Sequence, residues 1–188
     1  MTIILMFSLS QISNFSQEKI NLAIYQDAKL LFLGDSHQNK AGTMDLLSNI
    51  KLQGKQKQIG YPVYIIAYEQ ANLRVLFKRY SLDAGYTFNK IGYRNSFLNR
   101  LEITPTIGYG LINRYLKKKI KTSHGWSFST QISYQINQKI KIVFLNQLIR
   151  RTDIKQKKNK AKIIRYSAFF GMEFSLFKTS SYRTNNCF

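Results

Sequence analysis

Apolar and polar residues alternate along most of the segment 126–145, which reads WSFSTQISYQINQKIKIVFL. Between Trp126 and Ile136 the even positions are almost all apolar, and the odd positions carry Ser or Gln. A period of two is typical of a β-strand, in which successive side chains point to opposite faces. The polar pair Asn137 and Gln138 interrupts the run before the alternation resumes at Ile140. We therefore predict two strands joined by a tight turn.

The same alternation predicts eight strands along the chain. The predicted runs cover residues 20–32, 44–52, 61–71, 76–88, 100–111, 126–136, 140–144 and 164–176. The third run, YPVYIIAYEQA, is apolar on both faces, and Pro62 suits only the start of a strand or an edge. No helical segment of any length competes with these strands. Eight antiparallel strands suit either a sandwich or a closed up-and-down barrel, whose interior side chains can fill.

The residues on the polar faces indicate which way the apolar faces point. A water-soluble barrel would carry many long charged residues on its solvated face. The polar faces of the fourth, fifth, sixth and eighth runs carry mainly Ser, Thr, Gly and Gln instead. Small residues favour a crowded barrel interior, with the apolar face turned outward to lipid. A soluble ligand-binding barrel with its apolar face inward is the alternative.

Charged residues of both signs also fall on the polar side of the runs. We predict a polar, ion-paired network in the lumen, because an unpaired charge in a narrow interior would be expensive. Its predicted members are Asp27, Asp45, Lys51, Arg79, Asp83, Arg100, Glu102, Arg165 and Glu173. Glu69 is ambiguous because the third run is apolar on both faces. The alternative is an ordinary solvated face without pairing.

Aromatic residues gather near the ends of the runs, on the apolar side. Those singled out are Tyr86, Phe88, Tyr109, Trp126, Tyr134 and Tyr166. Aromatic girdles occur at the two interfaces of a membrane, although a core also contains tyrosines. The six residues are therefore candidates for two aromatic girdles.

The phrases YSLDAGYTFNKI, RLEITPTIGYG, SYQINQKIKIVFL and IRYSAFFGMEFSLF resemble the strands and turns of small outer-membrane β-barrels, especially the OmpA/OmpX-like type common in Bacteroidota. The resemblance covers roughly residues 18–177 as a pattern of strands. It implies an all-β, antiparallel transmembrane barrel in the bacterial outer membrane, with both termini in the periplasm. It also implies that QINQ is a periplasmic turn and that NRYLKKKIKT and RRTDIKQKKNKAK are outer loops. The tail, residues 178–188, departs from the family pattern, in which an aromatic residue often ends the last strand.

Residues 1–17, MTIILMFSLSQISNFSQ, contain no charge and have an apolar core. This segment resembles a secretory signal peptide, with cleavage around Ser16 and Gln17. A first buried strand is the alternative. No other segment approaches the ~20 uninterrupted apolar residues of a membrane helix.

The chain of 188 residues carries a formal net charge of +20, which favours an anionic partner. Two lysine clusters fall in the proposed outer loops: Lys117, Lys118, Lys119, Lys121, Lys155, Lys157, Lys158 and Lys160. They could contact lipopolysaccharide phosphates or simply be solvated. Nucleic-acid binding is the rival interpretation, but aromatics and lysines are segregated here, whereas single-strand binders interleave them. Protein partners in an envelope complex are also possible.

The sequence offers little support for catalysis. A hydrolase would need a base within reach of a nucleophile, but His124 and Ser127 should point to opposite faces of a strand. His37 lies in a polar loop, and the single cysteine, Cys187, is next to the C-terminus. No metal or nucleotide motif is present, so no cofactor is predicted. We predict a structural, adhesive or accessory protein and not an enzyme.

Overall fold

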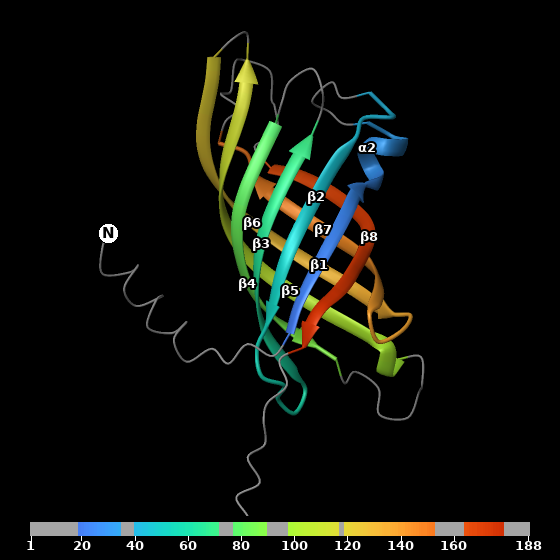
Figure 1. Cartoon of the computed structure of the whole chain (residues 1–188). Coiled ribbons are helices and arrows are strands. Elements are labelled where there is room, and N and C mark those ends of the chain that lie inside the picture. Colours follow the sequence, from blue (N-terminus) through green and yellow to red (C-terminus); the bar gives the residue numbers. More distant parts are fainter. Residues whose placement is uncertain are drawn as a thin grey trace, which may run out of the picture.

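The computed structural model describes residues 19–34, 40–71, 77–89, 98–116, 119–152 and 164–178. Its strands are β1 (Lys19–Asp27), β2 (Asp45–Gln53), β3 (Gly60–Ala71), β4 (Phe77–Phe88), β5 (Leu101–Leu116), β6 (Lys119–Gln135), β7 (Ile140–Arg150) and β8 (Ile164–Lys178). Each strand pairs antiparallel with the next, and β1 also pairs with β8, so the sheet closes on itself (Figure 1). The predicted eight-stranded up-and-down barrel is therefore confirmed.

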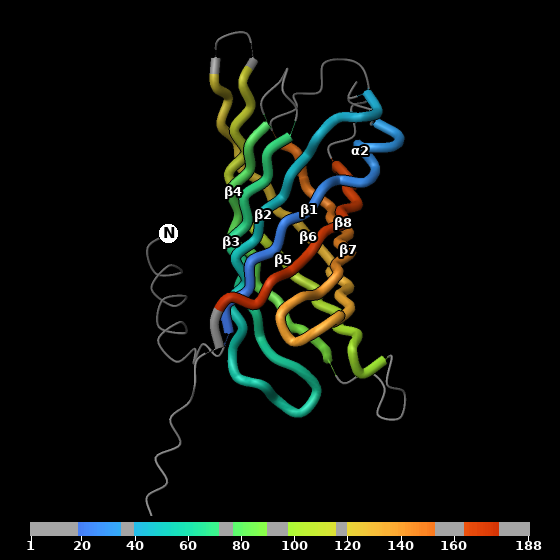
Figure 2. Tube along the Cα trace, turned by 45° about the vertical axis from the view of Figure 1, so that its right-hand side comes forward, coloured from blue at the N-terminus to red at the C-terminus, as the bar shows by residue number. Residues whose placement is uncertain are grey.

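The barrel has two different ends (Figure 2). We call the end that holds the start of β1, the end of β8 and the β6–β7 connection the turn end. The opposite end, where β1 leads to β2 and β5 leads to β6, is the loop end. At the loop end β5 and β6 reach beyond their neighbours, since β4 pairs with β5 only as far as Arg114 and β7 pairs with β6 only as far as Ser127.

The turn predicted at Asn137 and Gln138 is confirmed. Strand β6 ends at Gln135 and β7 begins at Ile140. The Asn137 side-chain oxygen accepts hydrogen bonds from the backbone N–H groups of Lys139 and Ile140, both at 2.9 Å. Such Asx-type contacts favour tight turns over a continued strand.

The first predicted strand is too long. It was expected to continue to Phe32, but β1 ends at Asp27 and helix α2 (Ala28–Phe32) follows. The Asp27 carboxylate accepts a hydrogen bond from the Leu30 backbone N–H at 3.1 Å, which is the bond of a helix N-cap. A short 3-10 helix, η1 (Leu98–Arg100), precedes β5. No helix in the part of the chain that the structure describes has the length and hydropathy needed to cross a membrane.

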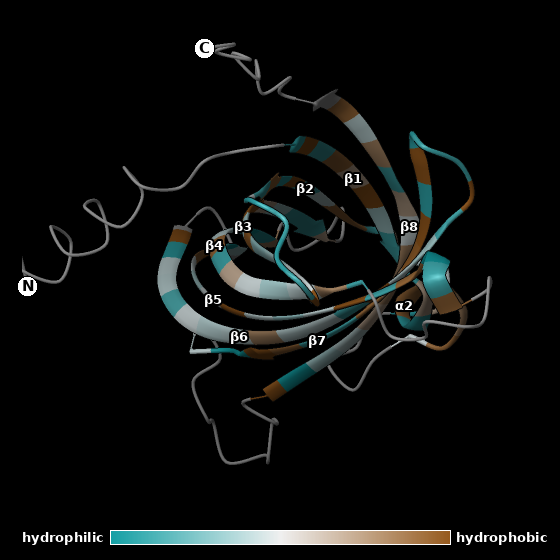
Figure 3. Ribbon diagram, turned by 90° about the horizontal axis from the view of Figure 1, so that it is seen from below, coloured by the Kyte–Doolittle hydropathy of each residue, from teal (hydrophilic) through white to brown (hydrophobic). Residues whose placement is uncertain are grey.

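The alternation of the sequence separates the two faces of the barrel wall, and the ribbon accordingly alternates between hydrophobic and hydrophilic residues along its strands (Figure 3). On β5 the inward Thr106 is 4% exposed, whereas its outward neighbour Ile107 is 59% exposed. The third strand is apolar on both faces because Val63 and Ile65 pack inside while Ile66 lies outside. The wall thus presents an apolar belt outward.

Candidate functional site

The barrel interior is the best-defined candidate site. It contains two clusters of charged side chains, one near each end, separated by a mostly apolar layer. The loop-end cluster consists of Asp27, Asp45, Glu69, Arg79, Asp83 and Arg165, and the turn-end cluster consists of Lys51, Glu102, Lys141 and Glu173. All ten of these residues are buried.

Arg165 is the centre of the loop-end cluster. Its guanidinium contacts carboxylates from three other strands: Glu69 at 2.9 Å, Asp27 at 3.4 Å, and Asp45 in a close ion pair. A planar guanidinium with five N–H donors suits this crowded arrangement better than a lysine would. Arg165 therefore ties β8 to β1, β2 and β3 across the closure of the barrel.

Arg79 extends this network to the other side of the lumen. Its guanidinium lies 3.6 Å from Glu69 and 3.8 Å from Asp83, and it donates a 2.6 Å hydrogen bond to the Ser127 hydroxyl. The loop-end cluster thus has four carboxylates and two guanidinium groups. The side chains of Arg151 and Arg165 both lie over the Phe77 ring, at 4.4 and 5.4 Å from its centroid.

Glu173 is the centre of the turn-end cluster. Its carboxylate lies 3.5 Å from Lys51 and 3.7 Å from Lys141, and it accepts hydrogen bonds from Gln131 at 2.9 Å and Asn21 at 2.5 Å. Several donors around one buried carboxylate satisfy most of its hydrogen-bonding capacity.

Glu102 completes the turn-end cluster. It contacts Lys141 at 2.6 Å and accepts a hydrogen bond from the Tyr61 hydroxyl at 3.0 Å. The two carboxylates, Glu102 and Glu173, therefore face two ammonium groups, those of Lys51 and Lys141. The formal charges of this cluster balance.

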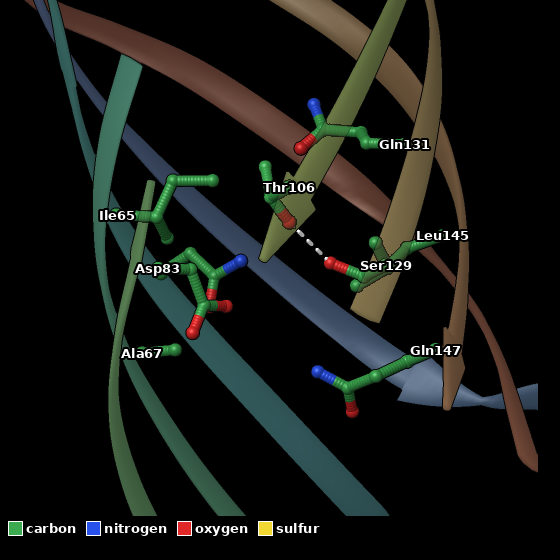
Figure 4. Close-up of a pocket in the computed structure, with 9 residues that line it drawn as sticks. Ile65, Ala67, Asp83, Thr106, Ser129, Gln131, Leu145 and Gln147 are labelled. Atoms are coloured by element: carbon green, nitrogen blue, oxygen red, sulfur yellow. Dashed lines mark hydrogen bonds between the residues drawn. The ribbon is translucent and has the colours of Figure 1, made fainter. Parts of the chain in front are cut away.

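The layer between the clusters fills the middle of the lumen. Its buried apolar members are Ala23, Tyr25, Leu47, Ile65, Ala67, Val143, Leu145 and Phe169. Figure 4 shows polar side chains beside them, including the hydrogen bond of 2.5 Å between the hydroxyls of Thr106 and Ser129. The space among Ile65, Ala67, Leu145, Thr106 and Ser129 is too small for a water molecule. The lumen is therefore filled by side chains at this level.

The structure places eight of the nine predicted lumen residues inside the barrel. The exception is Arg100, whose prediction is wrong: it lies in η1, before β5 begins, and its side chain is exposed. The alternation that suggested an inward position does not apply outside the strand. Glu69, left ambiguous by the sequence, is fully buried, and Lys141 was missed although it follows the same parity along β7.

Of the six aromatic residues predicted as girdles, four lie towards the ends of their strands and two lie near the middle. Tyr166 lies towards the loop end, whereas Tyr109 and Trp126 lie near the middle of β5 and β6, where their rings meet edge to face at 4.8 Å. Tyr86, Phe88 and Tyr134 lie towards the turn end, with the Tyr86 and Phe88 rings 5.1 Å apart. A further pair that was not predicted, Tyr68 and Tyr80, lies near the loop end, and its rings are also 5.1 Å apart.

The predicted lysine loops are described only in part. Lys119 and Lys121 do not lie in a loop: β6 begins at Lys119, which pairs with Leu116 of β5. This prediction is wrong because β6 keeps its pairing with β5 through these residues, with Lys121 opposite Arg114 and Ile120 opposite Tyr115. The other six lysines, Lys117, Lys118, Lys155, Lys157, Lys158 and Lys160, lie outside the described residues, as do the proposed signal peptide and the C-terminal tail beyond Lys178.

His124 and Ser127 lie on opposite faces of β6. His124 is exposed with its ring 5.7 Å from that of Tyr109, whereas Ser127 is buried and bonded to Arg79. Among the described residues no group of three or more His, Cys, Asp or Glu side chains is arranged to hold a metal ion. The three carboxylates around Arg165 are instead gathered on its guanidinium.

Several solved structures resemble this fold, although no family model and no curated protein matches the sequence. The Yersinia pestis outer membrane protein Ail, determined in a phospholipid bilayer nanodisc, has a TM-score of 0.51 and 11% sequence identity, over 85% of this chain and 100% of that one. The surface protein A (NspA) of Neisseria has a TM-score of 0.47 and 14% identity, over 84% of this chain and 95% of that one. The likeness to Ail supports the fold. Together with the apolar exterior and charged interior, it defines the class: an eight-stranded β-barrel of the outer-membrane type.

Proposed function

We propose that the protein spans the bacterial outer membrane as a structural, accessory or surface-binding barrel and is not an enzyme. The observation that supports this most strongly is the distribution of charge and exposure. Leu82 and Phe128 on the outer wall are 69% and 52% exposed, whereas Arg79 and Glu173 inside are 1% exposed. A water-soluble barrel would have the reverse arrangement. A hydrocarbon solvent favours apolar side chains on the outer wall and charged ones inside. The closed barrel suits the same solvent, because its strands satisfy their backbone hydrogen bonds with one another.

The filled lumen argues against a role as a wide pore. Two ion-paired clusters and the layer containing Tyr25 and Phe169 occupy the space that a solute would have to cross. Passage would require separating buried ion pairs, such as that of Glu173 with Lys51. We therefore infer that the function lies at the surfaces and not in transport through the barrel.

The excess of basic residues supports an anionic partner at the loop end. Lys121 lies near the loop end of β6, and the sequence has further lysines in the segments that adjoin this end. We propose that they contact phosphates of lipopolysaccharide. Each exposed contact is expected to be modest and to weaken with added salt. Protein partners in the cell envelope are a further proposal of the same kind.

Membrane fractionation of the expressed full-length chain tests this proposal, followed by electrophoresis of heated and unheated samples. We expect recovery in the outer-membrane fraction and a mobility that changes on heating, because the closed barrel resists detergent until heated. Recovery as a soluble protein without detergent would overturn the proposal. The chain would then be tested for binding of small apolar ligands and of RNA.

A further inference from the structure

Helix α2 carries an apolar surface that lies outside the barrel wall. Leu31, Phe32 and Leu33 follow one another and are 38%, 73% and 81% exposed, and Met44 is 58% exposed. We call these four residues the α2 platform. Three consecutive exposed apolar residues are rare in water unless they serve a function.

The chain around the platform is held by specific contacts. Leu30 is 2% exposed and fixes the inner side of α2, while the Asp27 carboxylate caps its first turn. The Leu33 N–H donates to the Lys29 carbonyl, and the Gly42 N–H donates to the Leu31 carbonyl, both at 2.8 Å. The exposure of the platform therefore does not come from fraying of the helix.

The platform lies beside the loop end of β8, to the side of the barrel (Figures 1 and 2). The Lys29 ammonium lies 5.6 Å from the centre of the Tyr166 ring, and the Tyr166 hydroxyl donates to Asn146 at 2.6 Å. Tyr166 is 46% exposed and follows Ile164, which is 60% exposed, on β8. The platform is thus continuous with the loop-end edge of the apolar belt.

We propose that the α2 platform inserts into the outer leaflet of the membrane, where acyl chains cover Phe32 and Leu33 and Lys29 reaches the lipid phosphates. This inference rests on the proposed membrane location of the barrel. Amphipathic segments that carry Phe, Leu and Lys lie with their apolar side chains ~5–10 Å into the headgroup and acyl boundary. The apolar stem of Lys29 can extend along Tyr166 while its ammonium stays in the polar zone.

A second copy of the chain would be a poorer occupant. Lys40 is exposed and lies two residues before Gly42, whose N–H donates to the Leu31 carbonyl of α2. Lys29 lies within α2, so positive charges flank the platform. Two platforms facing each other would bring these like charges together. Lipid phosphates would instead neutralise them.

Fluorescence quenching by brominated lipids tests the inference in single-tryptophan proteins reconstituted into phospholipid vesicles. The natural chain has one tryptophan, Trp126, on the outer wall, and it reports whether the barrel is in the bilayer. The second protein carries Trp126→Phe and Phe32→Trp. We expect its emission to fall to roughly half or less in lipids brominated near the headgroup, and less in lipids brominated deep in the chain, because the ring lies near the boundary.

The two proteins separate the possible failures. If Trp126 is quenched but the Phe32→Trp ring is quenched by acrylamide and not by lipid, the platform faces water and the inference is wrong. Protection of that ring from both quenchers would mean that protein covers the platform, as in contact with a second copy, and also overturns it. If Trp126 itself is not quenched by lipid, the proposed membrane location fails. Electrophoresis before and after heating shows that each variant is folded.

Discussion

At the residue scale, the buried carboxylates inside the barrel face cations from other strands, except Asp83, which pairs with Arg79 of its own strand. Glu173 illustrates this, since it contacts Lys51, Lys141, Gln131 and Asn21, which lie on β2, β7, β6 and β1. Removing one partner of a buried ion pair leaves a charge without compensation, whereas replacing both partners with apolar groups is often tolerated.

Glu173→Gln is therefore expected to lower the free energy of unfolding by about 3–5 kcal/mol. The double variant Lys51→Met, Glu173→Met should recover much of this loss, because Lys141 keeps its 2.6 Å contact with Glu102. Urea unfolding of the reconstituted protein measures both. A change of less than about 0.5 kcal/mol in the single variant, within the range of ordinary surface substitutions, would contradict the buried network.

At the element scale, Asp27 has two roles. One of its oxygens accepts from the Leu30 N–H and caps α2, while the other lies 3.4 Å from Arg165 in the lumen. The residue at which β1 ends thus connects the interior network to the helix that carries the platform. Asparagine at the same position could cap the helix but could not form the ion pair.

Trypsin cleavage after Lys29 should distinguish these roles. Loss of an N-cap weakens a helix by ~1 kcal/mol, so Asp27→Ala should raise the population of opened α2, and the cleavage rate, about fivefold. Asp27→Asn should cleave at close to the natural rate, while both variants lower the unfolding midpoint of the barrel. Equal cleavage of all three proteins would show that the cap does not hold α2.

Much of the fold could be predicted from the sequence because a half-buried strand repeats every two residues. The residues at which strands begin and end at the loop end could not be predicted in this way. Ala28, Leu30 and Phe32 fit the strand alternation and also the short helix that forms, and the alternation in β6 begins among lysines that suggested a loop. The position of a residue within the alternation, on the polar side or the apolar side, was enough to predict most of the residues that face the lumen.

The partners of those residues were beyond prediction from the alternation. Which carboxylates surround Arg165 depends on the stagger between strands and on the closure of β1 against β8. Neither the stagger nor the closure can be inferred from the alternation of a single strand. The same holds for Arg79, whose contacts come from β3, β4 and β6.

At the scale of the whole molecule, the solvent that covers the outer wall decides whether this arrangement of side chains is favourable. The belt of exposed apolar side chains, the two charged clusters in the lumen and the platform on α2 have a common explanation if that solvent is lipid. They have none if it is water, since the buried charges and exposed leucines would both be unfavourable there.

The most direct test is the stability of Ile107→Arg, with Gln138→Arg as the matched control. Ile107 lies near the middle of β5 on the outer wall and is 59% exposed, whereas Gln138 is exposed in the β6–β7 turn. In vesicles we predict that Ile107→Arg lowers the free energy of unfolding by about 2–4 kcal/mol, because an arginine near the bilayer midplane is unfavourable, and that Gln138→Arg changes it little. An Ile107→Arg protein as stable as the natural chain, and soluble without detergent, would show that the outer wall faces water.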